Sequence, residues 1–279
     1  SSGAYKLLFP IIKILTAIKN KKITVYKLEA YMEKLEDKNV KKLINKKINE
    51  NELNRDNFAF FYYNLNTNKY YFYNKEKWFV AASTTKVQIA MLYYEKINNK
   101  EINPNMGFVY KAEDFEAGNG LITNNCKVGD SIAIKTLLKE MIINSDNTAT
   151  NILADGLGGK KIYRKEFAKY TSVELPEKFY KENIISAEYG LDVLKYLFNN
   201  LGKYQELIED MKKSSEYMYL KKYVTDIDIA HKYGSYNGYV HDYGIVYGKN
   251  TYLIGIFTKE ISNASELIAT ISRDILEIV

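Results

Sequence analysis

The apolar positions in the first part of the chain predict a helix followed by a pair of strands. Over residues 27–48, apolar side chains recur every three or four positions, which indicates an amphipathic helix with a lysine- and glutamate-rich outer face. The aromatic run at 58–65 and the run at 70–73, separated by a polar turn, predict two paired strands. Residues 7–18 are also apolar, and we expect them to form a short helix that packs as an arm.

The middle of the chain, from Ser83 to about residue 201, carries a helical pattern with short loops. It predicts helices at 131–143, 147–157 and 186–198. Ser186 is suited to cap the N-terminus of the third of these helices. Beyond residue 201 the period shifts to that of strands joined by Gly and Asn turns. We expect strands at 227–233, 240–247 and 251–257, and a last helix at 264–278.

This order of elements predicts an α/β fold of the α+β type. Two early strands and three late strands would form one five-stranded antiparallel sheet, flanked by the terminal helices and interrupted by an inserted all-helical lobe. We expect a single domain with a sheet lobe at 24–82 and 202–279, a helical lobe at 83–201 and an N-terminal arm at 1–23. A cleft between the two lobes is the expected ligand site.

Composition narrows the possible partners and cofactors. The formal charge of +6 comes from scattered lysines without a nucleic-acid-binding motif, so we expect no nucleic-acid partner. The one cysteine, Cys126, excludes an intrachain disulfide. The two histidines, His231 and His241, form no cluster with ligand spacing, so we expect no metal and no cofactor. No apolar run reaches the length of a membrane span, and we expect a monomer.

The stretch Ser83-Thr-Thr-Lys86 stands where an apolar, aromatic run gives way to a helical pattern. A serine at the start of a helix faces unsatisfied backbone N–H groups, and its own N–H can help to hold an oxyanion. Lys86 lies one turn further on, so its nitrogen can reach the serine Oγ, and a desolvated lysine can act as a base. Taken alone, the pattern favours a helix-capping serine followed by a surface lysine.

A second motif, Ser145-Asp146-Asn147, falls between two predicted helices. A short loop there can direct Ser145 to relay a proton to a leaving amine and Asn147 to bind an amide carbonyl, with Asp146 turned inward as a structural pin. The same three residues are also well suited to a simple helix-capping turn.

A third motif, Lys232-Tyr233-Gly234, lies on a predicted strand. A lysine there would place a cation opposite the serines, where it suits a substrate carboxylate. Gly234 permits close approach of a substrate to the backbone, and the N–H of Ser235 could supply the second oxyanion donor beside that of Ser83. The alternative is an ordinary lysine on an edge strand.

In this order the three motifs match the penicillin-recognising serine enzymes, namely class A β-lactamases and D,D-peptidases. The chain resembles that family from about residue 58 to its end, with similar segments at 79–86 and 141–151, and with 230–234 and 241–246 similar to a strand hairpin of that family. The resemblance implies acylation of Ser83 by a β-lactam or a D-Ala-D-Ala-like amide.

The same resemblance implies roles for the other motif residues and a setting for the protein. Lys86 would be the base, Ser145 would relay a proton, and Lys232 would anchor a substrate carboxylate. The substrate would be a small molecule, either a β-lactam or a peptidoglycan-like peptide. We also expect an exported protein, extracellular or at the cell surface, with a signal segment removed ahead of Ser1, and a part in antibiotic resistance or cell-wall chemistry.

The third motif departs from the family at Tyr233, where the family usually has Thr or Ser. A small hydroxyl at that place helps to bind the substrate carboxylate. A tyrosine can still donate a hydrogen bond but needs more room, so we expect a changed substrate preference or a weaker pocket.

A second departure concerns hydrolysis of the acyl-enzyme. Class A β-lactamases carry a Glu followed by Asn four residues on, and that Glu directs the deacylating water. Between residues 151 and 186 no Glu has an Asn at that spacing, although Asn183 directly follows Glu182. The stretch is also short for the family's loop. The candidates for a deacylating carboxylate are Glu174, Glu177 and Glu182.

These observations leave three hypotheses. The first is a serine hydrolase that forms an acyl-enzyme with β-lactams or related amides, of the class A β-lactamase-like group. The second, favoured by the missing Glu–Asn pair, is a D,D-peptidase or other cell-wall amidohydrolase that hydrolyses β-lactams poorly. The third, motivated by Tyr233, is a non-catalytic peptidoglycan-binding module on the same fold.

Overall fold

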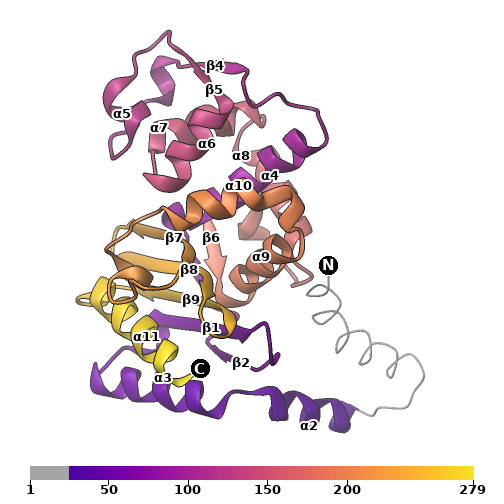
Figure 1. The fold of residues 1–279 in the computed structure, drawn as a ribbon, viewed down its shortest axis with the longest axis vertical. Helices are drawn as coiled ribbons and strands as arrows, with labels where there is room; N and C mark the ends of the chain where they lie inside the picture. Colours follow the sequence, from indigo (N-terminus) through magenta and orange to yellow (C-terminus); the bar gives the residue numbers. More distant parts are fainter. Residues whose placement is uncertain (1–24) are drawn as a thin grey trace.

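The computed structural model describes residues 25–279, and the predicted arm and its helix at 7–18 lie outside them (Figure 1). Within this range one antiparallel sheet has five strands in the order β2-β1-β9-β8-β7. The strands are β1 (Phe58–Asn64), β2 (Tyr70–Tyr73), β7 (Ile229–Tyr236), β8 (Tyr239–Tyr247) and β9 (Thr251–Lys259). The predicted fold class is therefore confirmed, and β7, which carries the third motif, is an edge strand.

Strand β1 is buried along its whole length because both faces of the sheet are covered. Its side chains alternate between two cores, as the two-residue period of a strand requires. Phe61 packs in the core beneath the helical block, whereas Phe60 and Tyr62 pack in the core beneath the terminal helices. This explains why the sequence there is a continuous aromatic run.

The terminal helices cover one face of the sheet, where α3 (Lys38–Glu50) contacts α11 (Ala264–Ile278) (Figure 1). The prediction of one helix over 27–48 was wrong, because α2 (Val25–Leu35) ends before Asp37 and α3 begins after it. The Asp37 carboxylate accepts hydrogen bonds from the backbone N–H groups of Asn39 and Val40 at 3.1 and 3.0 Å. This N-cap starts a new helix within an unbroken apolar pattern.

The inserted block between the strands is mainly helical. It contains α4 (Lys86–Asn98), α5 (Leu121–Asn125), α6 (Ile134–Ile143), α7 (Asn147–Gly156), α8 (Lys160–Glu166), α9 (Ala187–Asn199) and α10 (Leu201–Lys212). Ser186 caps α9 as predicted, since its Oγ accepts a hydrogen bond from the Tyr189 N–H at 3.1 Å.

Two short strand pairs in this part of the chain were not predicted. The segment 131–143 is not one helix, because β5 (Ser131–Ala133) pairs with β4 (Gly107–Val109) before α6 begins. The strand β3 (Trp78–Val80), which leads into the first motif, pairs with β6 (Ile184–Ser186). This second pair holds the chain just before Ser83 against the chain just before α9.

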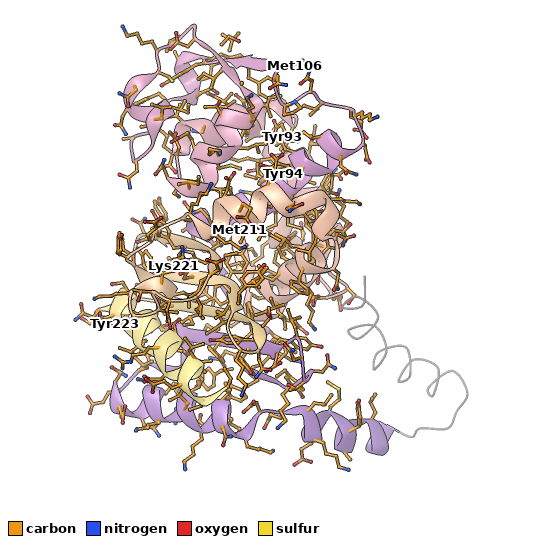
Figure 2. All side chains as sticks on the ribbon, viewed as in Figure 1. Tyr93, Tyr94, Met106, Met211, Lys221 and Tyr223 are labelled. Carbon is orange, nitrogen blue, oxygen red and sulfur yellow. The ribbon has the colours of Figure 1, made fainter. Side chains whose placement is uncertain are left out.

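Helix α4 runs through the centre of the molecule. Its residues from Lys86 to Tyr94 are all buried, so it lacks a polar face over its first two turns. Figure 2 places Tyr93 and Tyr94 of α4 near Met211 of α10, between the outer helices and the sheet, and α4 contacts α10. A lysine at the first position of such a helix is necessarily taken out of water.

Helices α9 and α10 lie against the sheet, since α9 contacts β1 and β9 and α10 contacts β7 (Figure 1). The division into a sheet lobe and a helical lobe at residues 83 and 201 stays a prediction. Over residues 25–279, no helix has both the length and the apolar character needed to cross a bilayer.

Candidate active site

Residues of the first two motifs, together with Ser235 directly after the third, line a cleft of about 400 Å³. Ser83 and Lys86 reach it from the end of β3 and the start of α4, Asn147 from the first turn of α7, and Ser235 from the edge strand β7. Segments more than sixty residues apart in the sequence are thus brought together around one serine. The placement fits the predicted cleft.

Ser83 lies in a 3-10 turn, η2 (Ala82–Thr85), and not at the first position of an α-helix as predicted. The turn leads straight into α4, and Ser83 is half-buried. Ala82 before it has a φ of 52°, in the left-handed region that non-glycine residues rarely adopt. Such a conformation persists only where surrounding contacts enforce it, which is common at functional sites.

Asn183 enforces the shape of this turn from the segment before α9. Its amide nitrogen donates to the Ala82 carbonyl at 2.9 Å, and its amide oxygen accepts from the Thr85 hydroxyl at 2.8 Å. The two bonds therefore hold the backbone before Ser83 and the side chain of Thr85 after it. Asn183 also lines the cleft. Sequence analysis noted this residue only because it follows Glu182, and gave it no role.

The Lys86 side chain connects the first motif to the second. Its Nζ donates to the Ser145 carbonyl at 2.7 Å, to the Ser145 Oγ at 3.1 Å and to the Asn147 Oδ1 at 2.8 Å. Within the described residues these are its hydrogen bonds, and none of them goes to the Ser83 Oγ. Burial lowers the pKa of Lys86 from 10.5 to about 7, against the opposing charges of Glu116 and Asp146. A lysine in this state can take up a proton near neutral pH.

Ser145 stands between two lysines. Its Oγ accepts from Lys86 Nζ at 3.1 Å and from Lys232 Nζ at 3.2 Å, and its backbone has a φ of 55°. A hydroxyl held between two amines can pass a proton from one to the other. The relay of a proton from Ser145 to a leaving amine stays a prediction.

Asp146 is turned inward, as predicted, and is fully buried. Its carboxylate accepts from the N–H of Ala149 at 3.0 Å, which caps α7, and from the Thr123 hydroxyl at 2.7 Å. It also accepts from the Ile122 N–H at 2.8 Å. Asp146 therefore fixes the position of its two neighbours Ser145 and Asn147.

Lys232 is fully buried and does not line the cleft. Besides Ser145, its Nζ donates to the Tyr233 carbonyl at 2.8 Å, and it lies 4.2 Å from the centre of the Tyr233 ring. Burial and the nearby Lys86 lower the pKa of Lys232, while Asp242 opposes them. Two lysines with lowered pKa values thus share one serine hydroxyl.

Tyr233 is held by a second tyrosine. Its ring stacks on that of Tyr219 with centres 4.8 Å apart and planes at 15°. Burial raises the pKa of Tyr233, although hydrogen bonds to the side chains of Ser145, Ser215 and Asn119 act against the rise. The phenol therefore stays protonated near Ser145, and the effect of Tyr233 on substrate preference stays a prediction.

Gly234 lets β7 run directly beside Ser83. A Cβ at this position would lie 2.8 Å from the Ser83 nitrogen and 2.9 Å from the Ala81 oxygen, closer than side chains approach backbone atoms. The backbone of Ser235 follows at the exposed mouth of the cleft. Ser83 and Ser235 are therefore neighbours across this contact, although the pairing of their N–H groups at an oxyanion stays a prediction.

The predicted deacylating carboxylates do not reach the cleft. Glu174 lines a separate hollow beside Trp78, Glu177 is paired at the surface with Lys181, and Glu182 is exposed. The residue four positions before Asn183 is Phe179, which is buried and packs edge-on against Trp78 and Tyr189. The segment that brings Asn183 close to Ser83 therefore has an aromatic residue, and not a glutamate, four positions before the asparagine.

Glu116 is the carboxylate that the described structure does bring to the cleft, and sequence analysis missed it. Its Oε2 accepts from the Asn151 amide at 3.0 Å, and its backbone N–H donates to the Thr148 hydroxyl at 3.1 Å. It lies in the long connection between β4 and α5, where the sequence carries no periodic signal that would locate it.

The histidines act within the core. His231 lies with Nδ1 2.7 Å from Asp242 and Nε2 2.6 Å from the Ser214 carbonyl. His241 donates from Nε2 to the Val80 carbonyl at 2.7 Å. Over residues 25–279, no group of three or more His, Cys, Asp and Glu side chains is arranged to hold a metal.

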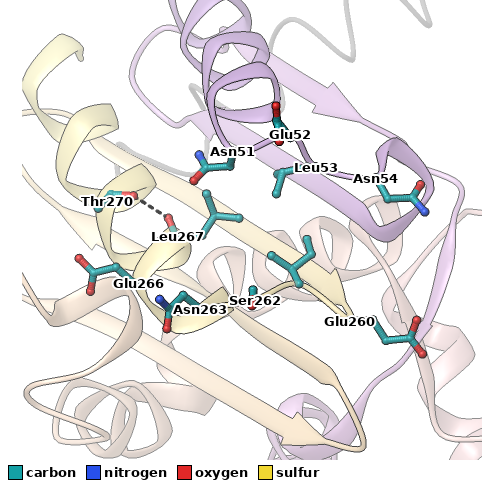
Figure 3. A pocket seen from close by; sticks show the side chains of 11 residues that line it. Asn51, Glu52, Leu53, Asn54, Glu260, Ser262, Asn263, Glu266, Leu267 and Thr270 are labelled. Carbon is teal, nitrogen blue, oxygen red and sulfur yellow. Dashed lines mark hydrogen bonds between the residues drawn. The ribbon is translucent and has the colours of Figure 1, made fainter.

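Another hollow, of about 410 Å³, lies at the far side of the sheet between the end of α3 and the start of α11 (Figure 3). Its polar wall includes Glu52, Glu260 and Glu266, and the last of these is paired with Lys222. It contains no motif residue, so the cleft at Ser83 remains the candidate active site.

Fold and motif arrangement together define the class of penicillin-recognising serine enzymes. The sequence profile of the beta-lactamase enzyme family matches residues 38–279, and the chain belongs to that family. No curated protein matches the sequence.

Solved structures share this fold at low sequence identity. PBP-A matches with a TM-score of 0.70 and 22% identity, over 80% of this chain and 90% of its own. The β-lactamase from Sphaerobacter thermophilus DSM 20745 has a TM-score of 0.70 and 22% identity, over 79% and 90%. The TLA-3 extended-spectrum β-lactamase has a TM-score of 0.75 and 18% identity, over 86% and 98%.

Proposed function

We propose that this protein is a serine enzyme that is acylated at Ser83 by β-lactams and related amides, and that it hydrolyses the acyl-enzyme slowly. The observation that carries the proposal is the buried Lys86, with a pKa near 7, bound to Ser145 next to the cleft that contains Ser83. A neutral amine and a relay hydroxyl beside an accessible serine are the parts that nucleophilic acyl transfer needs.

The proposed acylation has two steps, and Lys86 and Ser145 can take part in both. The Ser83 hydroxyl gives its proton to Lys86, directly or through Ser145, while its Oγ attacks the carbonyl carbon. The N–H groups of Ser83 and Ser235 hold the oxyanion. Collapse of the tetrahedral intermediate breaks the C–N bond, and Ser145, supplied by Lys86 or Lys232, protonates the leaving nitrogen. The protein acts on a small molecule and, in this proposal, outside the cytoplasm.

Slow hydrolysis is inferred because Phe179 stands four residues before Asn183, where class A β-lactamases have the glutamate that directs the deacylating water. Hydrolysis of the ester needs a base beside the attacking water, and none of Glu174, Glu177 and Glu182 lines the cleft. Glu116 does line it, but its carboxylate is held by Asn151 on the α7 side. A solved structure of a PBP-A mutant, in which a leucine is replaced by glutamate, is an acyl-enzyme complex with penicillin G, which supports acylation by a penicillin on this fold.

The direct test is covalent labelling. Incubation with a fluorescent penicillin should add one intact penicillin mass to the protein, and peptide mapping should locate it on Ser83. The adduct should persist for many minutes because the ester has no carboxylate base. Ser83→Ala should remain unlabelled with an unchanged circular dichroism spectrum. Neither adduct nor turnover, with wild type and Ser83→Ala alike, would refute the proposal.

A second candidate is a D,D-peptidase, and the same absence of a loop carboxylate favours it. The two activities separate in one comparison, in which turnover of a cephalosporin is measured beside release of D-alanine from a peptide ending in D-Ala-D-Ala. A peptidase releases D-alanine and is inhibited by the cephalosporin. A β-lactamase consumes the cephalosporin and leaves the peptide intact. Slow binding of peptidoglycan fragments without acylation would instead identify a binding module.

A further inference from the structure

The candidate active cleft extends well beyond the catalytic motifs, along one side of α7. Asn147, Thr150, Asn151 and Ala154 all line it, and this spacing of three and four residues places them on one face of the helix. At 1.5 Å per residue, Ala154 lies about 10 Å further along the axis than Asn147. Because Asn147 is bound to Lys86, the Ala154 end is the end remote from Ser145 and Lys232.

Two cations from α8 line the same cleft. Lys160 and Arg164 are four residues apart, so they project from one face of the helix, and Tyr163 between them also lines the cleft. Tyr163 is buried against Phe167 and hydrogen-bonded to the Arg164 side chain, which anchors this face of α8. Sequence analysis assigned no role to α8.

These cations are not neutralised by their surroundings. The ion pairs of this region, among the described residues, join Lys169 to Glu95 and Glu166 and leave Lys160 and Arg164 without a carboxylate partner. Glu116 is the one carboxylate in the described lining, and it is bound to Asn151, one turn short of Ala154. The Ala154 end of the cleft therefore has an excess of positive charge.

The two ends suit different parts of a substrate. Chemistry at Ser83 places the leaving amine toward Ser145 and Lys232, so the acyl part of the substrate extends the other way, along α7. We propose that Lys160 and Arg164 form a subsite for a carboxylate at the distal end of the acyl group. The preferred substrate is then an amide whose acyl chain carries a terminal carboxylate several atoms from the scissile bond. This inference rests on the proposed acylation of Ser83.

A matched set of penicillins tests the subsite. Acylation of 6-aminopenicillanic acid with hexanoate, adipate or 6-aminohexanoate gives three compounds that share four methylenes and differ only in the end of the acyl chain: methyl, carboxylate or protonated aminomethyl. The second-order rate of Ser83 labelling should be about fivefold higher for the adipoyl than for the hexanoyl compound, as for one partly exposed ion pair. The 6-aminohexanoyl compound should be slowest, and added salt should reduce the differences.

Variants assign the effect to α8. Lys160→Gln with Arg164→Gln should remove the adipoyl advantage, so that the adipoyl and hexanoyl compounds label Ser83 at equal rates, and Lys160→Glu should favour the ammonium compound. Lys161→Gln with Lys165→Gln is the matched control, because these exposed lysines of the same helix do not line the cleft. This control should behave as wild type. Thermal unfolding of each variant verifies that the fold is retained.

The outcomes separate the two proposals. Equal labelling by the adipoyl and hexanoyl compounds would overturn the subsite while confirming acylation. The subsite would also be overturned if the adipoyl compound kept its advantage over the hexanoyl compound in the variant that lacks both cations. Failure of all three compounds to label Ser83 would refute the proposed function, and the subsite would fall with it.

Discussion

At the scale of single residues, the proposed chemistry depends on Lys86. It sits at the first position of a helix whose first two turns are buried on all sides, and its three hydrogen-bond acceptors are neutral oxygens of Ser145 and Asn147. Neutral oxygens hold the amine in place. A carboxylate would do so too, but it would also stabilise the ammonium form more strongly. The residue is therefore prepared as a base by its environment and not by its chemical type.

We predict that the rate of Ser83 acylation rises with pH and levels off above about 7, the pKa of Lys86. The neutral amine is the base, and its fraction increases about tenfold per pH unit below the pKa. The measurement is the second-order labelling rate between about pH 5 and 9, because the lowered pKa of Lys86 lies within that range. A rate that is constant across it would show that Lys86 is not the base.

Sequence analysis could name the motif residues of the candidate site, but not the residues that reach it through long connections. Ser83, Ser145 and Lys232 were named from their motifs, because a motif with a fixed spacing can be recognised without knowledge of the fold, and their roles stay predictions. Glu116 and Asn183 were not found as site residues, since each reaches the cleft through a long connection whose course depends on tertiary contacts. The burial of Lys232 beneath Tyr233 was equally out of reach.

At the scale of elements, the site depends on how closely β7 passes the turn that contains Ser83. Gly234 makes this contact possible, and the strand pair β3–β6 holds the other side of the turn. Strong periodic elements such as α11 were predicted with the bounds they have. The three-residue strands β3 to β6 were missed because so short a segment shows no period, and Asp37 divided a helix whose apolar pattern is continuous.

Gly234→Ala should reduce the acylation rate by about 100-fold, because the added methyl must displace β7 or the Ser83 turn by a fraction of an ångström to an ångström. Gly202→Ala is the control, since a Cβ there meets no atom within 4 Å and its place in α10 favours alanine. The measurement is the acylation rate of each variant with the same fluorescent penicillin. Equal rates for both variants would mean that the close contact is not required.

At the scale of the whole molecule, the sheet and the catalytic turn are tied together by His241. It lies on β8, receives a hydrogen bond from the Thr258 N–H of β9 at 3.0 Å and donates to Val80 of β3 at 2.7 Å. One nitrogen accepts and the other donates, so the ring is neutral in the fold. Burial lowers the pKa of His241 from 6.5 to about 4.

The free energy of unfolding should therefore fall as the pH is lowered from about 6.5 to about 4, where the unfolded chain binds a proton at His241 and the folded chain does not. The full loss from this residue is about 3 kcal/mol, reached below the folded pKa. Urea titrations at several pH values measure it. His241→Gln should flatten this part of the profile, and an unchanged slope in that variant would contradict the assignment.

With Phe179 in place of a deacylating glutamate, the amount of protein limits how many drug molecules can be removed. An enzyme that regenerates its serine quickly removes drug in proportion to time, so a few copies suffice. A molecule whose serine stays occupied removes one drug molecule and is then spent, so its capacity is set by copy number and by the rate of synthesis. In a cell, any protection by this protein would saturate at a drug concentration fixed by its abundance.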